Sequence, residues 1–238
     1  MASKYDMIKD WDVVNELRIH HTLTDIHGYK LIKDIFDYTR QKMPGTALYL
    51  NDCGTEQPGG HLTDFKALVE KLIAEGVDFD GIGLQTHVGN YFMLEQFYNI
   101  LNDLSTTYGK RLKIKEYDNN LYDEHLSASQ TRDLMIAMYS CEAVDGFYCW
   151  KFKDLSTLKN KLIFDRDWNL KPIGEQFIDL VYNKWWTRES GKTGDDGAYK
   201  TRGYFGDYDI TVSANGQTKT VSAKLYKNSD KNIVITLD

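Results

Sequence analysis

The amino-acid sequence predicts an α/β fold of consecutive strand–helix units, followed by a small β-sandwich-like module. The first observation is a repeat of about 31 to 36 residues in short apolar stretches that suit buried strands, which begin near Trp11, Ala47, Gly81, Leu112 and Gly146. The second is an amphipathic helical pattern after each of these stretches. The third is a change of pattern after Trp186, where apolar and polar residues alternate. We expect an α/β portion over residues 1–187 and an all-β module over residues 188–238.

The first two helices are bounded by recognisable start and stop signals. The first is expected over residues 26–43, with Asp25 as its N-cap and Pro44-Gly45 at its end. The second is expected to start after Thr63 and to stop at Gly76, because glycine readily adopts the conformation that ends a helix.

The remaining helices follow the same logic. The third carries apolar residues from Leu94 to Leu104 and should end before Gly109. The fourth is expected to start near Ser129. The fifth should open at Pro172, since proline is favoured in the first helical turn.

The C-terminal module shows turn and strand signals. A Gly-, Thr- and Asp-rich segment over residues 187–197 is typical of a linker. Asn215-Gly216 is a strong hairpin signal, and it lies between alternating residues 208–212 and a strand-like segment at 219–225. A further strand is expected at 233–237. A packing or spacer role for this module is favoured over sugar binding.

Composition limits the classes of function. The net charge of −6 argues against nucleic-acid and anionic-membrane partners. No apolar run is long enough to span a membrane, and we expect no signal peptide in this chain. The aromatic content of 13% suits sugar binding, although aromatic cores explain it nearly as well. We favour free, buried thiols for Cys53, Cys141 and Cys149 over one disulfide.

Each predicted strand ends in polar or aromatic side chains. In chain order these are Asn15 and Glu16, Asn51 and Asp52, Gln85 and His87, Glu116 and Asp118, and Trp150 and Lys151. The functional site of a βα fold forms at the C-terminal ends of its strands, so the sequence predicts a site there. Two glutamates on separate strand ends suggest an acid/base and nucleophile pair, as glycoside hydrolysis requires.

Three of these segments carry a resemblance to a known family. Residues 11–16 (WDVVNE), 81–87 (GIGLQTH) and 112–118 (LKIKEYD) are similar, in order, to motifs of the family 10 glycoside hydrolases, the endo-β-1,4-xylanases. The resemblance runs from about Ile8 to about Trp186. It implies a TIM (β/α)8-type barrel, of which this chain holds about five βα units, equivalent to strands four to eight.

The resemblance also implies roles for the catalytic carboxylates and their neighbours. Glu16 corresponds to the general acid/base, and Asn15 beside it to the residue that binds the sugar 2-hydroxyl. Glu116 corresponds to the nucleophile. His87 is expected to hydrogen bond to that nucleophile and to be oriented by Asp118.

Further resemblances concern the sugar-binding surface. Gln85 would reach the sugar, Asn51 belongs to a segment resembling the fifth-strand motif, and Trp150 would form a floor for the sugar. The sequence departs from the family at Cys53, where a tyrosine is common, and at residues 155–158 (LSTL), where a second tryptophan is usual. We expect no metal and no cofactor, and the His20-His21 pair has no context that suggests a role.

The distance between the two glutamates constrains the fold. A retaining glycosidase holds its two carboxyl groups about 5 to 5.5 Å apart. In a flat sheet with strands in sequence order, three spacings would separate Glu16 from Glu116 by about 14 Å. The chemistry therefore requires a closed barrel of eight strands, whereas the sequence supplies five. An open part-barrel is expected to expose two strand edges and an apolar interior.

Three solutions remain open: a separately supplied N-terminal half, which we favour, a second copy of the chain, or a stable fragment without activity. The sequence thus predicts a retaining endo-β-1,4-xylanase that acts on xylan or xylo-oligosaccharides. The alternative is an inactive carbohydrate-binding or scaffold protein. An open doubly wound protein that binds a small ligand is a third hypothesis, but no Gly-rich phosphate loop follows any strand. A polysaccharide substrate implies secretion.

Overall fold

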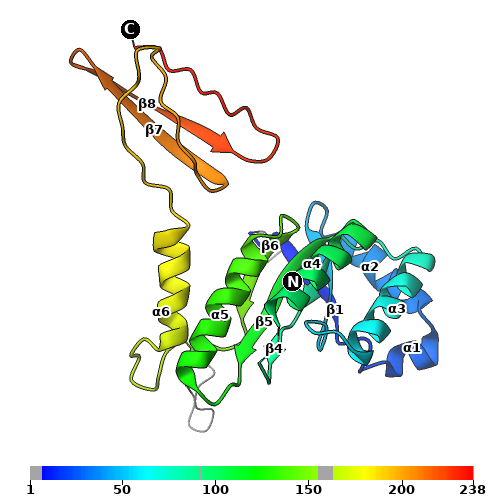
Figure 1. The fold of residues 1–238 in the computed structure, drawn as a ribbon. Coiled ribbons are helices and arrows are strands. Elements are labelled where there is room, and N and C mark those ends of the chain that lie inside the picture. Colours follow the sequence, from blue (N-terminus) through cyan, green and yellow to red (C-terminus); the bar gives the residue numbers. More distant parts are fainter. Residues whose placement is uncertain (1–6, 92, 155–162, 238) are drawn as a thin grey trace. The chain divides into compact units, whose positions relative to one another are not determined.

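The computed structural model describes residues 7–91, 93–154 and 163–237, and the chain divides into two compact units, Met1–Phe177 and Ile178–Asp238 (Figure 1). The sheet of the first unit is formed by six strands: β1 (Asp10–Asn15), β2 (Ala47–Asp52), β3 (Gly81–Leu84), β4 (His87–Val88), β5 (Arg111–Asn119) and β6 (Val144–Cys149).

The strand order follows the order of the chain. Strand β1 pairs with β2, β2 with β3, β3 with β5 and β5 with β6, and every pair is parallel. The five strands expected from the repeat are therefore present. The two-residue strand β4 was not expected; it pairs with the C-terminal end of β5 and places His87 opposite Asp118.

Helices connect the strands of this sheet. They are α1 (Thr22–His27), α2 (Lys30–Lys42), α3 (Gly60–Ala74), α4 (Leu94–Tyr108), α5 (Glu124–Tyr139) and α6 (Pro172–Ile178), the last of which continues as a π-helix over Asp179–Lys184. Helix α4 ends as expected, with Gly109 in the left-handed conformation after it.

The expected start of three helices was wrong. The first helix is broken at Gly28, whose φ of 72° ends α1, so Asp25 lies inside α1 and is not a cap. Helix α3 starts at Gly60, ahead of Thr63. Helix α5 starts well before Ser129, because the Asp123 side chain accepts a hydrogen bond from the Leu126 backbone amide and caps the first turn.

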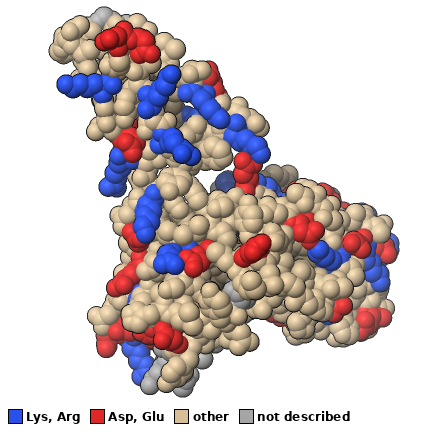
Figure 2. Space-filling view, in the orientation of Figure 1, with Lys and Arg blue, Asp and Glu red and all other residues tan. Residues whose placement is uncertain are grey.

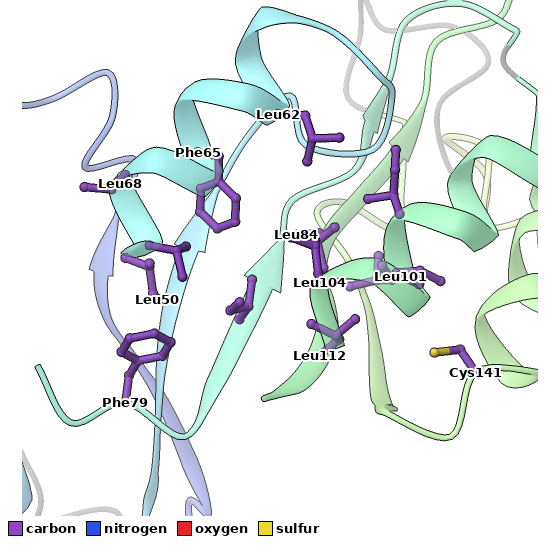
Figure 3. Packing of buried hydrophobic residues seen from close by; sticks show 14 of the residues in the cluster. Leu50, Leu62, Phe65, Leu68, Phe79, Leu84, Leu101, Leu104, Leu112 and Cys141 are labelled. Carbon is purple, nitrogen blue, oxygen red and sulfur yellow. The ribbon is translucent and has the colours of Figure 1, made fainter. Parts of the chain in front are cut away.

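The hydrophobic core lies between the helices and one face of the sheet. Alternate residues of the strands, such as Leu48 and Leu50 of β2, point to this face. The helices contribute fully buried side chains, among them Phe65 of α3 and Leu104 of α4 (Figure 3). Most residues of the core cluster come from α2 to α5 and from β2 to β5, and the cluster packs these helices against the sheet.

The opposite face of the sheet carries an ion-pair network. The Lys115 ammonium lies 3.0 Å from Asp10 Oδ1 and 3.1 Å from Asp12 Oδ1, and Lys113 lies 2.5 Å from Asp10 Oδ2. Both lysine side chains are more than nine-tenths buried, and both stack over the ring of Tyr49. We expected this face, which would be the interior of a barrel, to be apolar. That expectation is wrong for these strands, because the face holds paired charges.

Glycines on the face of the sheet opposite the helices make room for this network. A Cβ atom built on Gly81 would lie 2.1 Å from a carbon of the Tyr49 ring, so the tyrosine packs directly on the glycine backbone of the neighbouring strand. At Gly83 an added Cβ would lie 2.5 Å from Asn51 Oδ1. Strand β3 is therefore a flat surface on which side chains of β2 rest.

The second unit contains a β-hairpin. Strands β7 (Gly206–Ala214) and β8 (Gln217–Leu225) pair in antiparallel fashion around the expected Asn215-Gly216 turn, in which both residues have positive φ. Where the sequence predicts a third strand, residues 233–237 have no strand pairing. In the described part of this unit, one hairpin stands where a small sandwich was expected.

The surface of the chain carries mixed charge. Acidic and basic side chains are interspersed on the face seen in Figure 2. No helix in the described ranges is both long and apolar enough to cross a membrane. Cys53, Cys141 and Cys149 are free thiols as expected, but only Cys141 is buried, whereas Cys53 and Cys149 are half-buried.

The core predicts a large cost for truncating Phe36. This side chain of α2 is fully buried and contacts Phe79 edge-on, so Phe36→Ala should lower the free energy of unfolding by about 3–5 kcal/mol. Tyr38 on the same helix is 63% exposed, and Tyr38→Ala should cost less than about 1 kcal/mol. Urea denaturation of both variants measures the difference, and equal costs would contradict the assigned core.

The ion-pair network predicts a stability that depends on pH. Burial is the largest influence on Asp10 and would raise its pKa, but hydrogen bonds and charges from Lys113 and Lys115 outweigh it, so the pKa is lowered. A lowered folded pKa contributes stability above the unfolded value of about 4, and this stability is lost as the pH falls through the folded pKa. Asp10→Asn should remove that dependence and cost roughly 2 kcal/mol at pH 7, because it leaves two buried ammonium groups underpaired.

Asp34→Asn is the matched control for this substitution. Asp34 forms an exposed pair with Lys30 on α2, at 2.7 Å, and its loss should cost less than about 0.5 kcal/mol. Urea unfolding between pH 3 and 7 distinguishes the two. If the free energy of unfolding of Asp10→Asn falls with decreasing pH as steeply as that of the parent, the network does not stabilise the fold.

Candidate active site

The acid/base candidate Glu16 lies immediately after β1, where the strand ends. Its backbone φ is 54°, which is uncommon for a residue other than glycine. Glu16 Oε1 accepts a 3.0 Å hydrogen bond from Gln85 Nε2, and Glu16 Oε2 lies 3.0 Å from His20 Nε2. Both carboxylate oxygens therefore have a partner.

The amide of Asn51 links the two ends of the site. Its Nδ2 donates to Asn15 Oδ1 and to Glu116 Oε1, each at 2.9 Å. Because a carboxylate only accepts hydrogen bonds, the orientation of this amide is fixed by Glu116. The register of the sheet places Asn15 opposite Asn51 on the neighbouring strand. Strand β2 thus connects the end of β1 with the end of β5.

Gln85, the residue directly after β3, completes the connection. Its Nε2 donates to Asn15 Oδ1 at 3.1 Å as well as to Glu16. A continuous chain of hydrogen bonds therefore runs from Glu16 through Gln85, Asn15 and Asn51 to Glu116. These five residues, which we call the amide chain, come from four strand ends and were all singled out in the sequence.

His87 is held between two carboxylates. Its Nδ1 lies 3.1 Å from Asp118 Oδ1, and its Nε2 lies 3.6 Å from Glu116 Oε2. The hydrogen bond to Asp118 is the main reason that the pKa of His87 is raised, and the charges of Asp118, Glu116 and Glu56 add to it. The Trp150 ring, which is 53% exposed, meets the His87 ring edge-on at 6.1 Å between centroids.

Opposing influences act on Glu116. Burial is the largest and raises its pKa, whereas the charge of His87 and the hydrogen bond from Asn51 lower it. The charge of Glu16 raises the pKa further, so the two carboxylates are close enough to affect each other. The net direction is upward. A pair of interacting carboxylates at the ends of parallel strands can serve acid/base and nucleophilic chemistry.

Asp52, although at a strand end, points to other partners. It is fully buried, and it accepts hydrogen bonds from the backbone amides of Arg18 and Cys53. The Arg18 guanidinium also donates to the Cys53 carbonyl at 2.9 Å and lies 2.9 Å from His61 Nδ1. These contacts hold the turns that follow β1 and β2 together, so Asp52 stabilises the backbone next to the site.

Two titratable residues of the site were missed in the sequence. His20 contacts Glu16, and the only signal for it is the spacing of four residues. Glu56 is nearly fully buried, with one carboxylate oxygen that has no hydrogen-bond partner in the described structure, and burial raises its pKa. The departure at residues 155–158 lies outside the described residues. Among the residues that are described, no three His, Cys, Asp or Glu side chains are grouped as a metal site.

Known proteins resemble this chain over most of its length. Residues 1–180 match the model of "Glycosyl hydrolase family 10". Anti-sigma-I factor RsgI6 of Acetivibrio thermocellus is 29% identical over 211 residues, which cover 88% of this chain and 27% of that protein. Endo-1,4-beta-xylanase 1 of Arabidopsis thaliana is 24% identical over 234 residues, covering 97% and 24%. The chain spans about a quarter of the length of these curated relatives.

Solved structures resemble the first unit. The intracellular xylanase TsXylA of Thermoanaerobacterium saccharolyticum aligns with a TM-score of 0.65 and 26% identity, covering 74% of this chain and 60% of that one. Xylanase 10B of Thermotoga petrophila, solved in complex with xylobiose, aligns with a TM-score of 0.66 and 23% identity, covering 77% and 63%. Together with the mostly parallel sheet, these likenesses show a fold of the TIM-barrel class.

The site geometry predicts the titration of His87. Because Asp118 raises the pKa of His87, its imidazole should titrate above the ordinary value of about 6.5, and Asp118→Asn should lower the midpoint. Histidine ring signals in proton NMR spectra recorded against pH measure this shift. Asp25→Asn, which removes an exposed carboxylate from α1, should leave the His87 midpoint unchanged. A midpoint insensitive to Asp118→Asn would contradict the assigned hydrogen bond.

Proposed function

The chain belongs to glycosyl hydrolase family 10, and from this premise we propose that it is the catalytic portion of a retaining endo-β-1,4-xylanase. The substrate would be xylan or xylo-oligosaccharides, as the names of several relatives and the xylobiose bound to one similar structure suggest. The observation that carries the proposal is the amide chain, which joins Glu16 and Glu116 although they are a hundred residues apart in the sequence.

In the proposed mechanism, Glu116 is the nucleophile and Glu16 the general acid/base. Glu116 attacks the anomeric carbon while Glu16 protonates the departing glycosidic oxygen, which yields a glycosyl-enzyme ester. Glu16 then removes a proton from the water that releases the sugar. Forming the ester removes the charge of Glu116 and so favours the ionised form of Glu16 in the second step.

The neighbouring side chains have supporting roles in this proposal. His87, oriented by Asp118, faces Glu116 Oε2 and favours the ionised nucleophile. Asn51 holds the other oxygen of Glu116. The exposed ring of Trp150 next to His87 offers an apolar surface on which a pyranose ring could stack.

Full activity would require the rest of the barrel. We propose that the five long strands correspond to strands four to eight of the family, and that an N-terminal half supplies the first three βα units. The ends of the sequence-ordered sheet, β1 and β6, have unpaired outer edges in the described residues that such a half could occupy. Secretion would follow from a polysaccharide substrate.

A binding or scaffold role is the second candidate. A relative that is 29% identical over most of this chain is named an anti-sigma factor, so a similar portion also occurs in a protein named for a regulatory role. The open edges of the sheet favour the same alternative for this chain by itself. It predicts affinity for xylo-oligosaccharides without release of reducing sugars during a long incubation.

The mechanism predicts that Glu116→Ala abolishes xylan hydrolysis, with a loss of at least about 1,000-fold in kcat. Azide should restore turnover of an activated xylobioside and give a glycosyl azide of inverted configuration, because the small anion enters where the carboxylate was. Reducing-sugar release is measured with the chain alone and with a co-expressed N-terminal half.

Glu75→Ala is the control for this test, since Glu75 is an exposed residue at the C-terminal end of α3 and is not a member of the amide chain. It should keep the parental rate. Xylan hydrolysis that persists in Glu116→Ala would contradict the assignment of Glu116 as the nucleophile. Binding of xylo-oligosaccharides by a parent chain that never releases product would favour the scaffold alternative.

A further inference from the structure

Three aromatic rings gather in the chain that follows β6. The Phe152 and Trp168 rings lie 6.0 Å apart between centroids and are tilted by 30°, and the Phe164 ring lies 5.7 Å from that of Trp168. Phe152 and Trp168 are each 57% exposed, whereas Phe164 is half-buried beside them. We call the two exposed rings, Phe152 and Trp168, the aromatic platform. It leaves adjoining apolar surface in contact with water.

Backbone hydrogen bonds fix the segments that carry the platform. The Phe164 amide donates to the Phe152 carbonyl at 2.8 Å, and the Asp154 amide donates to the Phe164 carbonyl at 3.0 Å. The Lys171 amide donates to the Ile163 carbonyl at 2.8 Å and closes the loop that contains Trp168. The two rings are therefore presented by paired backbone, which holds them in a defined arrangement.

A tight turn holds Trp168 in an uncommon backbone conformation. Its φ is 67°, in the left-handed region that glycine enters readily and that bulky residues avoid. The Asp165 carboxylate accepts hydrogen bonds from the Asp167 amide and from the amide and side chain of Asn169, each at 2.8 Å. Glycine at position 168 would fit this turn with less strain, so the turn itself does not explain a tryptophan there.

The platform adjoins the sugar-binding side of the proposed site. Phe152 comes two residues after Trp150, so their Cα atoms are at most about 7 Å apart. The Trp150 ring, also exposed, meets the His87 ring edge-on, and His87 Nε2 lies 3.6 Å from Glu116 Oε2. Exposed aromatic residues therefore follow one another from the neighbour of His87 to the platform.

The groups around the platform favour a sugar chain over an apolar protein partner. Lys153 Nζ lies 4.0 Å from the centre of the Trp168 ring, and the neighbours Asp167 and Asn169 are exposed. Charged residues are depleted at the centre of protein interfaces, whereas ligand sites combine flat apolar surface with a few polar groups. A pyranose ring has an apolar face that can stack on an aromatic ring and hydroxyl groups that can bond to such neighbours.

We propose that the aromatic platform is a further subsite for the xylan chain, on which a xylose unit outside the cleavage position stacks. The inference rests on the proposed function, which supplies the identity of the sugar. The platform contributes to binding and takes no part in the bond-breaking step. It should matter more for a long oligosaccharide than for xylobiose, because a long chain can cover both Trp150 and the platform.

Binding of xylohexaose and xylobiose, measured by isothermal titration calorimetry, tests the proposal. Every protein carries Glu116→Ala so that the sugars are not consumed. Trp168→Gly removes the ring and relaxes the turn, and it should raise the Kd for xylohexaose at least about fivefold, as the loss of one stacking contact implies. The Kd for xylobiose should rise less. Phe152→Ala should act in the same direction, and Trp168→Tyr, which keeps a flat ring, should retain most of the affinity.

Tyr38→Ala is the matched control. Tyr38 is 63% exposed and has the Lys42 ammonium over its ring at 5.4 Å, as Trp168 has Lys153, but it belongs to α2. Its Kd for xylohexaose should equal that of the parent. Unchanged xylohexaose binding in both Trp168→Gly and Phe152→Ala would overturn the subsite, and so would a parent that binds neither sugar.

The N-terminal barrel half is the other possible occupant, and a second titration with that half co-expressed distinguishes it. If Trp168→Gly then weakens assembly of the two halves and leaves the Kd for xylohexaose unchanged, the platform is an interface and the inference is wrong. Reducing-sugar release by the parent, with Glu116 present, tests the proposed function separately. Failure of the subsite and failure of the proposed function therefore give different results.

Discussion

One carboxamide holds the candidate site together. Asn51 donates from a single nitrogen to Asn15 on one side and to Glu116 on the other. Its position depends on the register of β2, since a slip of one residue would turn it to the helix-covered face. It also depends on Gly83 next to it, where a side chain would collide with the Asn51 oxygen. The sheet therefore has to be correct before the two glutamates can share a site.

The face of the sheet opposite the helices is charged where an apolar interior was expected. An apolar interior would have to be covered, but Lys113 and Lys115 are neutralised by Asp10, Asp12 and Asp145, and their stems pack over Tyr49. Paired charges of this kind tolerate water at their rim. The core and the site are stabilised by different faces of one sheet.

The strand positions and the polar strand ends were predictable from the sequence, because the repeat and the apolar stretches report local periodicity directly. Helix starts were harder to predict. Asp123 caps α5 and Gly28 breaks the first helix, and both features depend on local backbone angles that the residue type alone does not determine. The pairing of Asp10 with Lys113 joins residues more than a hundred positions apart, and lysines within a strand suggest solvent exposure rather than burial. His20 was missed because a turn, not a motif, places it beside Glu16. The catalytic roles of Glu16 and Glu116 remain predictions.

The close packing of Tyr49 on Gly81 also limits how this chain can change over generations. Any residue larger than glycine at position 81 would strike the aromatic ring at 2.1 Å, so the tyrosine must first be replaced by something smaller. That replacement would strip the aromatic cover from Lys113 and Lys115. Mutational routes across these two strands therefore have an obligatory order, and random libraries that vary position 81 alone will be depleted of folded members.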